Sequence, residues 1–226
     1  MRLHYWETRQ SLTPQKALAF LKEGNQRFIN NLRMNHDLLQ LVNDTAEKQF
    51  PFTAILSCSD SRVSTELVFD QGLGDIFSVR LAGNIASVNA IGSIEFACKA
   101  LGSKLIVVLG HTKCGAVKGA CDHVQLGNLN TILEHIGHAV DLETETVNDR
   151  TSHNKQFVDN VTRINVERNI GLILESSEII RDMVKAGEVD IIGAIYDVET
   201  GKVEFMDRAG EDTNNHAYET QNWKTS

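Results

Sequence analysis

Apolar residues recur along this chain with two spacings, one typical of helices and one typical of buried strands. Near the start, Thr13-Pro14 precedes apolar residues at 17, 18, 21 and 28, which predicts a helix with an N-cap and proline at its first position. The same reasoning predicts further helices, one of them ended by Gly102, at 89–101, 114–120, 129–142 and 157–183.

Short apolar runs between these helices predict strands at 52–56, 76–81, 104–109 and 191–196. The run at 104–109 is rich in β-branched residues, as in parallel strands buried on both faces. Glu199-Thr200-Gly201 predicts a turn into a short hairpin partner at 203–206. The predicted fold class is therefore α/β, with a mostly parallel central β-sheet flanked by helices.

The rest of the chain predicts a single domain with two appendages. An N-terminal helical arm is expected at about 11–35, and a polar C-terminal tail at about 209–226. A polar link at about Glu143–Lys155 separates two of the later helices, and its first part, Glu143–Glu145, is expected to be a solvated acidic stretch. The length of 226 residues favours one domain over two.

Composition narrows the choice of partners. The chain is 42% hydrophobic, enough for a core, and carries 30 acidic against 22 basic residues, for a net charge of −8. No basic block stands out, so nucleic acid and anionic membranes are not expected as partners, and a small molecule fits better. We expect no membrane span and no secretory signal, hence a cytoplasmic protein, although a periplasmic protein whose signal had been removed would look the same.

The four cysteines divide into two kinds by their neighbours. Cys58 and Cys114 lie in polar segments that follow predicted strands, whereas Cys98 lies in an apolar run and Cys121 is intermediate. A chain of this size needs no disulfide framework, so we expect Cys98 and Cys121 to be packing residues.

Two polar segments, Cys58-Ser-Asp-Ser-Arg62 and His111-Thr-Lys-Cys114, each follow a predicted strand. Parallel strands would bring both to the same sheet edge, where ligands bind in open α/β folds. One imidazole and two thiolates suit zinc, and three protein ligands leave a fourth position for water, as in catalytic sites. Bound zinc lowers the pKa of that water to roughly 7.

Asp60 and Arg62 extend this hypothesis in two ways. Asp60 could accept a hydrogen bond from metal-bound water or bind the metal itself, with Arg62 holding the carboxylate ionised. The alternative is an ordinary surface ion pair, worth about 0–1 kcal/mol. The residues alone leave both interpretations open.

Cys-Ser-Asp-Ser-Arg at 58–62 with Gly-His-Thr-Lys-Cys-Gly-Ala-Val at 110–117 resembles the β-class carbonic anhydrases. The similarity runs from Thr13-Pro14, through Gly-Asn-Gln-Arg-Phe at 24–28, to Tyr196-Asp197 and Gly201. The resemblance implies reversible hydration of carbon dioxide to bicarbonate and a proton. It places one zinc ion per chain on Cys58, His111 and Cys114.

The resemblance also implies roles for neighbouring residues. Zinc hydroxide would attack the carbon while Asp60 orients it and Arg62 holds Asp60, and in some members the aspartate moves onto zinc as a fourth ligand. The substrate pocket would include Gln49, Phe77 as an aromatic wall, Phe96 where some relatives have tyrosine, and the amide of Gly115. A homodimer or homotetramer with its active sites at the subunit interface is implied.

Relatives with a regulatory bicarbonate site use a tryptophan, an arginine and a tyrosine. Arg80 and Tyr196 match this set, but Ile55 replaces the tryptophan, so we expect the open, water-bound form and no regulatory site.

Three alternatives remain open at this point. A related zinc scaffold could hydrolyse carbonyl sulfide or carbon disulfide. The zinc could instead be structural, although a closed structural site would take a fourth Cys or His. His135 and His138, three apart on a predicted helix, are expected to be helix-surface residues or at most contributors to proton transfer.

Overall fold

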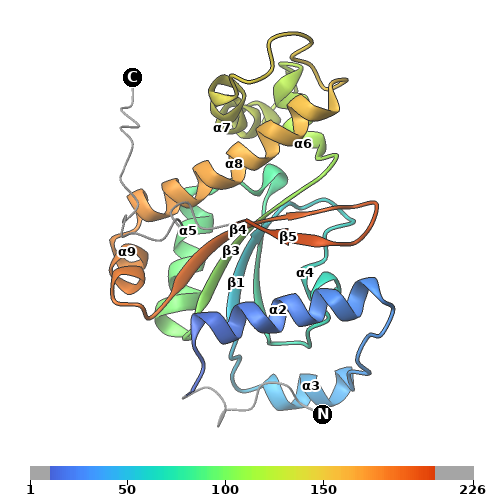
Figure 1. Cartoon of the computed structure of the whole chain (residues 1–226). Helices are drawn as coiled ribbons and strands as arrows, with labels where there is room; N and C mark the ends of the chain where they lie inside the picture. Colours follow the sequence, from blue (N-terminus) through green and yellow to red (C-terminus); the bar gives the residue numbers. More distant parts are fainter. Residues whose placement is uncertain (1–10, 207–226) are drawn as a thin grey trace, which may run out of the picture.

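The computed structural model describes residues 11–206 and is built on a five-stranded sheet (Figure 1). The strands lie in the order β2-β1-β3-β4-β5. Their bounds are β1 Thr53–Ser57, β2 Ile76–Arg80, β3 Leu105–His111, β4 Asp190–Tyr196 and β5 Val203–Phe205. The first four are parallel and β5 pairs antiparallel with β4, so the predicted fold class is confirmed. The polar tail predicted at about 209–226 lies outside the described residues.

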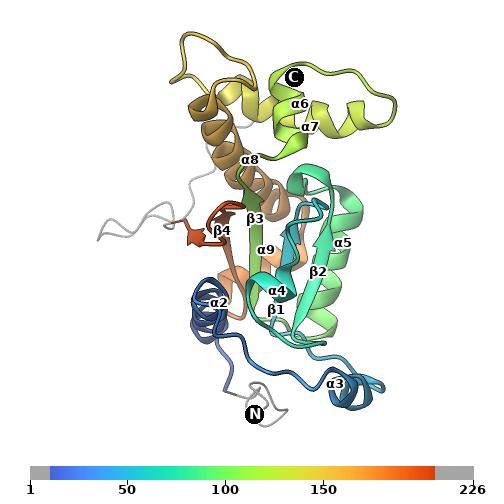
Figure 2. The same cartoon turned by 90° about the vertical axis from the view of Figure 1, so that its right-hand side faces the viewer.

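Helices cover both faces of the sheet and one of its ends (Figure 2). One face packs against α2 (Pro14–Ile29) and α4 (Thr65–Val68). The other packs against α5 (Val88–Glu95), α8 (Lys155–Ser176) and α9 (Glu178–Lys185). A third apolar cluster joins α8 to α6 (Gly115–Cys121) and α7 (Leu129–Leu142), beyond the carboxyl ends of the strands. α3 (Leu38–Thr45) buries none of its residues.

The alternation of side chains along the strands explains the two main apolar clusters. Ile55 and Val107 point to the α2 side, whereas Leu56, Ile106 and Val108 point to the α8 side. All seven residues of β3 are buried because the strand is central and covered on both faces. This is why its sequence is almost uninterrupted in apolar residues.

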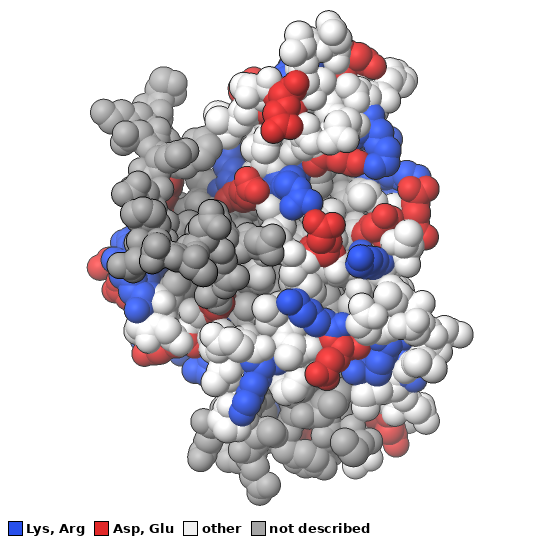
Figure 3. Space-filling view, viewed as in Figure 1, with Lys and Arg blue, Asp and Glu red and all other residues white. Residues whose placement is uncertain are grey.

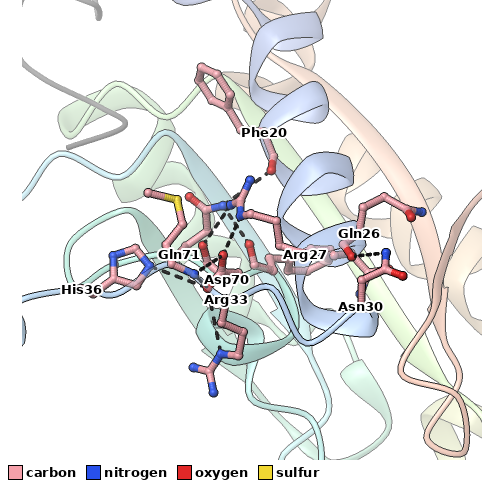
Figure 4. Close-up of polar contacts among 12 residues, drawn as sticks. Phe20, Gln26, Arg27, Asn30, Arg33, His36, Asp70 and Gln71 are labelled. Carbon is pink, nitrogen blue, oxygen red and sulfur yellow. Dashed lines mark hydrogen bonds and ion pairs between the residues drawn. The ribbon is translucent and has the colours of Figure 1, made fainter. Parts of the chain in front are cut away.

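A buried carboxylate ties the N-terminal arm to the end of α4 (Figure 4). Asp70 accepts a hydrogen bond from Arg27 Nε of α2 at 2.6 Å and another from the Met34 amide at 3.2 Å. Arg33 Nε and His36 Nε2 lie 3.9 and 3.8 Å from its other oxygen. These contacts fix the chain between α2 and α3 on the body of the molecule.

Local hydrogen bonds account for where the helices begin and end. The predicted N-cap Thr13 accepts from Lys16 N at 3.3 Å, and the predicted helix at 129–142 has those bounds. The single helix predicted at 157–183 is wrong, since α8 and α9 are separated at Ser177. The Ser177 backbone is extended, and its Oγ donates to Glu95 Oε1 at 2.5 Å and accepts from Ile180 N at 3.1 Å.

Three other elements, η2 (Phe96–Ala100), α3 and α4, differ from the predictions made from sequence. The helix predicted at 89–101 continues from α5 into a π-turn, η2, and α3 and α4 were not predicted at all because both are short.

Glu143 corrects the expectation of a solvated acidic stretch. It is 2% exposed, and its carboxylate accepts from Arg150 Nη1 at 2.6 Å, Thr146 Oγ1 at 2.8 Å and Asn160 Nδ2 at 3.0 Å. The expectation failed because these donors lie up to 17 residues away and only the folded link brings them together.

Candidate metal centre

The two polar segments meet at the carboxyl edge of the sheet. Cys58 directly follows β1, His111 is the last residue of β3, and these strands are neighbours with Ser57 opposite Leu109. Cys114 is the N-cap residue of α6. The donor atoms of Cys58, His111 and Cys114 lie within 4.8 Å of one another, and all three residues are buried. The folded chain therefore assembles the predicted ligand set.

The imidazole of His111 is set up to offer one nitrogen. Its Nδ1 lies 3.0 Å from the Thr112 carbonyl oxygen, which assigns the ring proton to Nδ1. Its Nε2 is buried and has no hydrogen-bond partner among the described residues. An unpartnered imidazole nitrogen beside two sulfur atoms is a donor set that fits zinc.

Cys58 and Cys114 are free cysteines, and their Sγ atoms lie 4.0 Å apart, close enough for one thiol to donate a hydrogen bond to the other sulfur. The Cys114 thiol, His111 and two backbone N–H groups hold the pKa of Cys58 well below its usual range, although burial works the other way. The bond to Cys58 and burial raise the pKa of Cys114. Cys58 is thus the first to become a thiolate, the form that binds metal.

Asp60 and Arg62 form a two-pronged ion pair beside the donors. Arg62 Nε donates to Asp60 Oδ1 at 2.9 Å, and Arg62 Nη2 donates to Oδ2 at 2.7 Å. This arginine holds the pKa of Asp60 well below its usual range. Asp60 Oδ2 also lies 4.0 Å from His111 Nε2, so the carboxylate borders the donor set while both its oxygens face Arg62.

Arg80 has a structural role that the sequence analysis missed. It is the last residue of β2, and its guanidinium donates to the carbonyl oxygens of Cys58 at 3.2 Å and Asp60 at 2.7 Å. These two bonds hold the loop that carries the first cysteine. The sequence offered one signal for this role: Arg80 is a basic residue at the end of a predicted strand, and that strand follows the one that leads into Cys58.

The other predicted site residues fall into two groups. Gly115 is exposed and begins α6 directly after Cys114. Gln49 is exposed in the loop before β1, at the opposite edge of the sheet from the donors. Phe77, the second residue of β2, and Phe96, at the start of η2, contact each other edge-on with ring centroids 6.1 Å apart. Within one chain, Gln49 and this aromatic pair do not join the donor set.

The remaining two cysteines are buried but are not part of the donor set. Burial raises the pKa of Cys98 to about 12 and that of Cys121 to about 11. Both thiols stay protonated and pack in apolar clusters, as the sequence analysis expected.

One face of the molecule shows how charges of both signs are distributed. On the face drawn in Figure 3, acidic and basic side chains are interspersed and form no continuous basic patch. Within residues 11–206, no helix is long and apolar enough to cross a bilayer.

Fold and site together define an α/β protein with a Cys-His-Cys donor set at the carboxyl edge of a parallel sheet. Residues 53–203 match the family model described as carbonic anhydrase. The chain belongs to the carbonic anhydrase family, and its structural neighbours place it in the β class.

Individual relatives support the same assignment. Carbonic anhydrase 2 of Mycobacterium tuberculosis is 34% identical over 204 residues, covering 87% of this chain and 95% of that protein. A carbonic anhydrase of Synechococcus elongatus is 30% identical over 202 residues, covering 85% of this chain and 72% of that protein. The β-carbonic anhydrase CafA of Aspergillus fumigatus superimposes with a TM-score of 0.68 at 26% identity, covering 85% of this chain and 90% of that one.

Proposed function

We propose that this enzyme catalyses the reversible hydration of carbon dioxide to bicarbonate and a proton at a zinc ion held by Cys58, His111 and Cys114. One observation carries the proposal: a buried, thiol-rich donor set with an unpartnered imidazole nitrogen lies beside a carboxylate that an arginine holds ionised. Zinc, when bound there, supplies a Lewis acid that makes water acidic enough to react at neutral pH.

The chain's own residues position and activate the reactants. Asp60, as a carboxylate, accepts the hydrogen bond of the attacking oxygen and so aims its lone pair at the carbon of carbon dioxide. Arg62 keeps Asp60 ionised and oriented through its two bonds to the carboxylate. Gly115 is an exposed residue at the start of α6, and its N–H donates to an oxygen of bicarbonate as negative charge develops on it. We propose that Asp60 stays bound to Arg62 in the active form of the enzyme. Only in a resting form would Asp60 leave Arg62 and become a fourth ligand of the metal.

We further propose that the active enzyme is a homodimer or homotetramer. Gln49 and the Phe77–Phe96 pair lie apart from the donors of their own chain, so they would line the pocket of a second copy. The related β-carbonic anhydrases from Sordaria macrospora, at a TM-score of 0.65 and 26% identity, are tetrameric. The four free cysteines suit a reducing cytoplasm, where we place the enzyme.

Zinc content and stopped-flow carbon dioxide hydration, measured on the same samples, test the metal site. Wild type should bind one zinc per chain and be active. Cys58→Ser should lose both, while the matched control Cys98→Ser, which changes a buried cysteine outside the donor set, should keep both. A wild-type protein that is folded and loaded with zinc but has no hydration activity contradicts the proposal.

The roles of Asp60 and Arg62 need a separate comparison. Asp60→Asn should keep zinc and lower kcat/KM about 10²–10⁴-fold, the range for loss of a positioned proton-accepting group. Arg62→Ala should lower it less, because the carboxylate remains but is no longer held. Full activity in both variants would remove this ion pair from the mechanism.

A further inference from the structure

Two asparagines are buried in the mainly apolar face that α8 turns toward the rest of the molecule. Asn165 is 1% exposed and Asn169 is 2% exposed, and they lie one turn apart with Val166, Ile170 and Ile173 around them. A buried amide without partners costs about 1–3 kcal/mol, so such residues are tolerated only where they bind something. Their partners therefore identify what this face of the helix holds.

Both amides bind the segment between β2 and α5. Asn165 Nδ2 donates to the carbonyl oxygen of Gly83 at 2.9 Å, and Asn169 Oδ1 accepts from Ala86 N at 2.6 Å. Asn169 Nδ2 also donates to Asn165 Oδ1 at 3.1 Å, which fixes the direction of the Asn165 amide with its nitrogen toward Gly83. The pair thus holds residues 83–86 at two points.

Gly83 connects this pair to the metal donors. Its N–H donates to Cys58 Sγ at 3.4 Å, and its backbone is left-handed, with φ of 67°. The N–H that binds Cys58 and the carbonyl that binds Asn165 both belong to Gly83, so holding the carbonyl restricts the orientation of the N–H. A hydrogen bond to a thiolate stabilises the charged form and directs its remaining lone pairs.

We propose that Asn165 is a positioning residue for the metal centre. By binding the carbonyl oxygen of Gly83, Asn165 holds the N–H group of Gly83 on the Cys58 thiolate, and Asn169 orients Asn165. This inference rests on the proposed metal site. It adds to that site two residues, Asn165 and Asn169, that lie at least 107 positions after Cys58 in the sequence. Outer contacts of this kind typically change metal affinity by about 10–100-fold when they are removed.

The test compares Asn165→Leu with a matched control on the same helix, Thr162→Val. Thr162 is also buried, at 3% exposed, but its hydroxyl donates within the helix to Val158 O at 2.7 Å. The zinc dissociation constant is measured by competition with a chromophoric chelator, and the thiolate-to-metal absorption band is recorded with Co²⁺ in place of zinc. Neither readout depends on hydration activity.

We expect Asn165→Leu to weaken zinc binding about 10–100-fold and to shift the cobalt band, while Thr162→Val changes neither. If Asn165→Leu matches Thr162→Val in both measurements, Asn165 is only structural and the proposal is overturned.

A second measurement covers the case in which Asn165→Leu does not fold. In wild-type protein loaded with ¹¹³Cd²⁺, the Gly83 amide should show scalar coupling to the metal through Cys58 Sγ, and Asn165→Ser should weaken it. Absence of coupling in a protein that binds one Cd²⁺ overturns the inference alone. A wild type that binds neither Zn²⁺ nor Cd²⁺ overturns the proposed function as well, so the two failures are distinguishable.

Discussion

Gly83 is a position where a single methyl group should be strongly destabilising. A Cβ placed there would lie 2.4 Å from Ile136 Cδ1 and 3.3 Å from Ile136 Cγ1, and Ile136 is completely buried. The residue also has φ of 67°, in the region that favours glycine. We therefore predict that Gly83→Ala is among the more damaging small substitutions in this protein.

The magnitude follows from two separate effects. A left-handed conformation costs an alanine about 1–2 kcal/mol, and forcing an extra methyl group into a packed core costs about 1–3 kcal/mol. The two costs together are about 2–5 kcal/mol, and the free energy of unfolding should fall by about 2–4 kcal/mol, in the lower part of this range, because the end of the Ile136 side chain can move. Adding Ile136→Val removes Cδ1, so the double variant should be less unstable than the two single changes together predict.

Gly137→Ala is the matched control. It lies beside Ile136 on α7, and a Cβ there would meet nothing within 4 Å. In a helix interior, alanine is favoured over glycine by about 0.5–1 kcal/mol, so this variant should be slightly more stable than wild type. Urea unfolding of the metal-free proteins, followed by far-ultraviolet circular dichroism, measures all of them. A Gly83→Ala variant whose free energy of unfolding is within about 0.5 kcal/mol of wild type would refute the reasoning. Changes that small are typical of surface substitutions, whereas each of the two effects predicts a larger loss.

Three further substitutions test the buried polar contacts. Glu143→Gln should lower the free energy of unfolding by about 1–3 kcal/mol at pH 7. Burial alone would raise the pKa of Glu143, but its hydrogen bonds outweigh burial and lower the pKa below the usual 4.5. The carboxylate therefore contributes fully to the free energy of unfolding above that pH, and the contribution is lost as the pH falls through the pKa of the folded protein. Urea unfolding should show a smaller difference in stability between Glu143→Gln and wild type at pH 4 than at pH 7. Asp70→Asn should cost about 1–3 kcal/mol in the same assay, because asparagine accepts the positive φ of 46° but does not replace the charge facing Arg27. Ser177→Ala should cost about 1 kcal/mol and speed hydrogen exchange at the start of α9.

The contradicting results differ between these variants. For Glu143, the exposed Glu145 supplies a control, and an equal pH dependence in Glu143→Gln and Glu145→Gln would be the adverse result. For Asp70, the adverse result is a variant as stable as one with the exposed Asp141→Asn change. For Ser177, it is unchanged exchange of the Ile180 amide, which donates to the Ser177 hydroxyl.

Much of the fold and the identity of the candidate metal donors were determined by the sequence alone. The strands were found because alternation and β-branched runs are local signals, and the helix at 129–142 because its apolar spacing is complete. Cys58, His111 and Cys114 were found because each lies at or just after a strand end, and parallel strands bring such ends to one edge.

Only the tertiary structure decided how those donors are held. The Gly83 N–H reaches Cys58 across 25 positions in sequence, and Asn165 reaches Gly83 across 82. Ser177 ends a helix that its own apolar spacing would continue, because its hydroxyl binds Glu95, 82 positions away. Hydrogen-bond partners this distant leave no periodic trace in the chain, since any polar residue of suitable reach can serve. The sequence thus determined which side chains can bind a metal, and the packing of the folded chain decided which distant groups contact them.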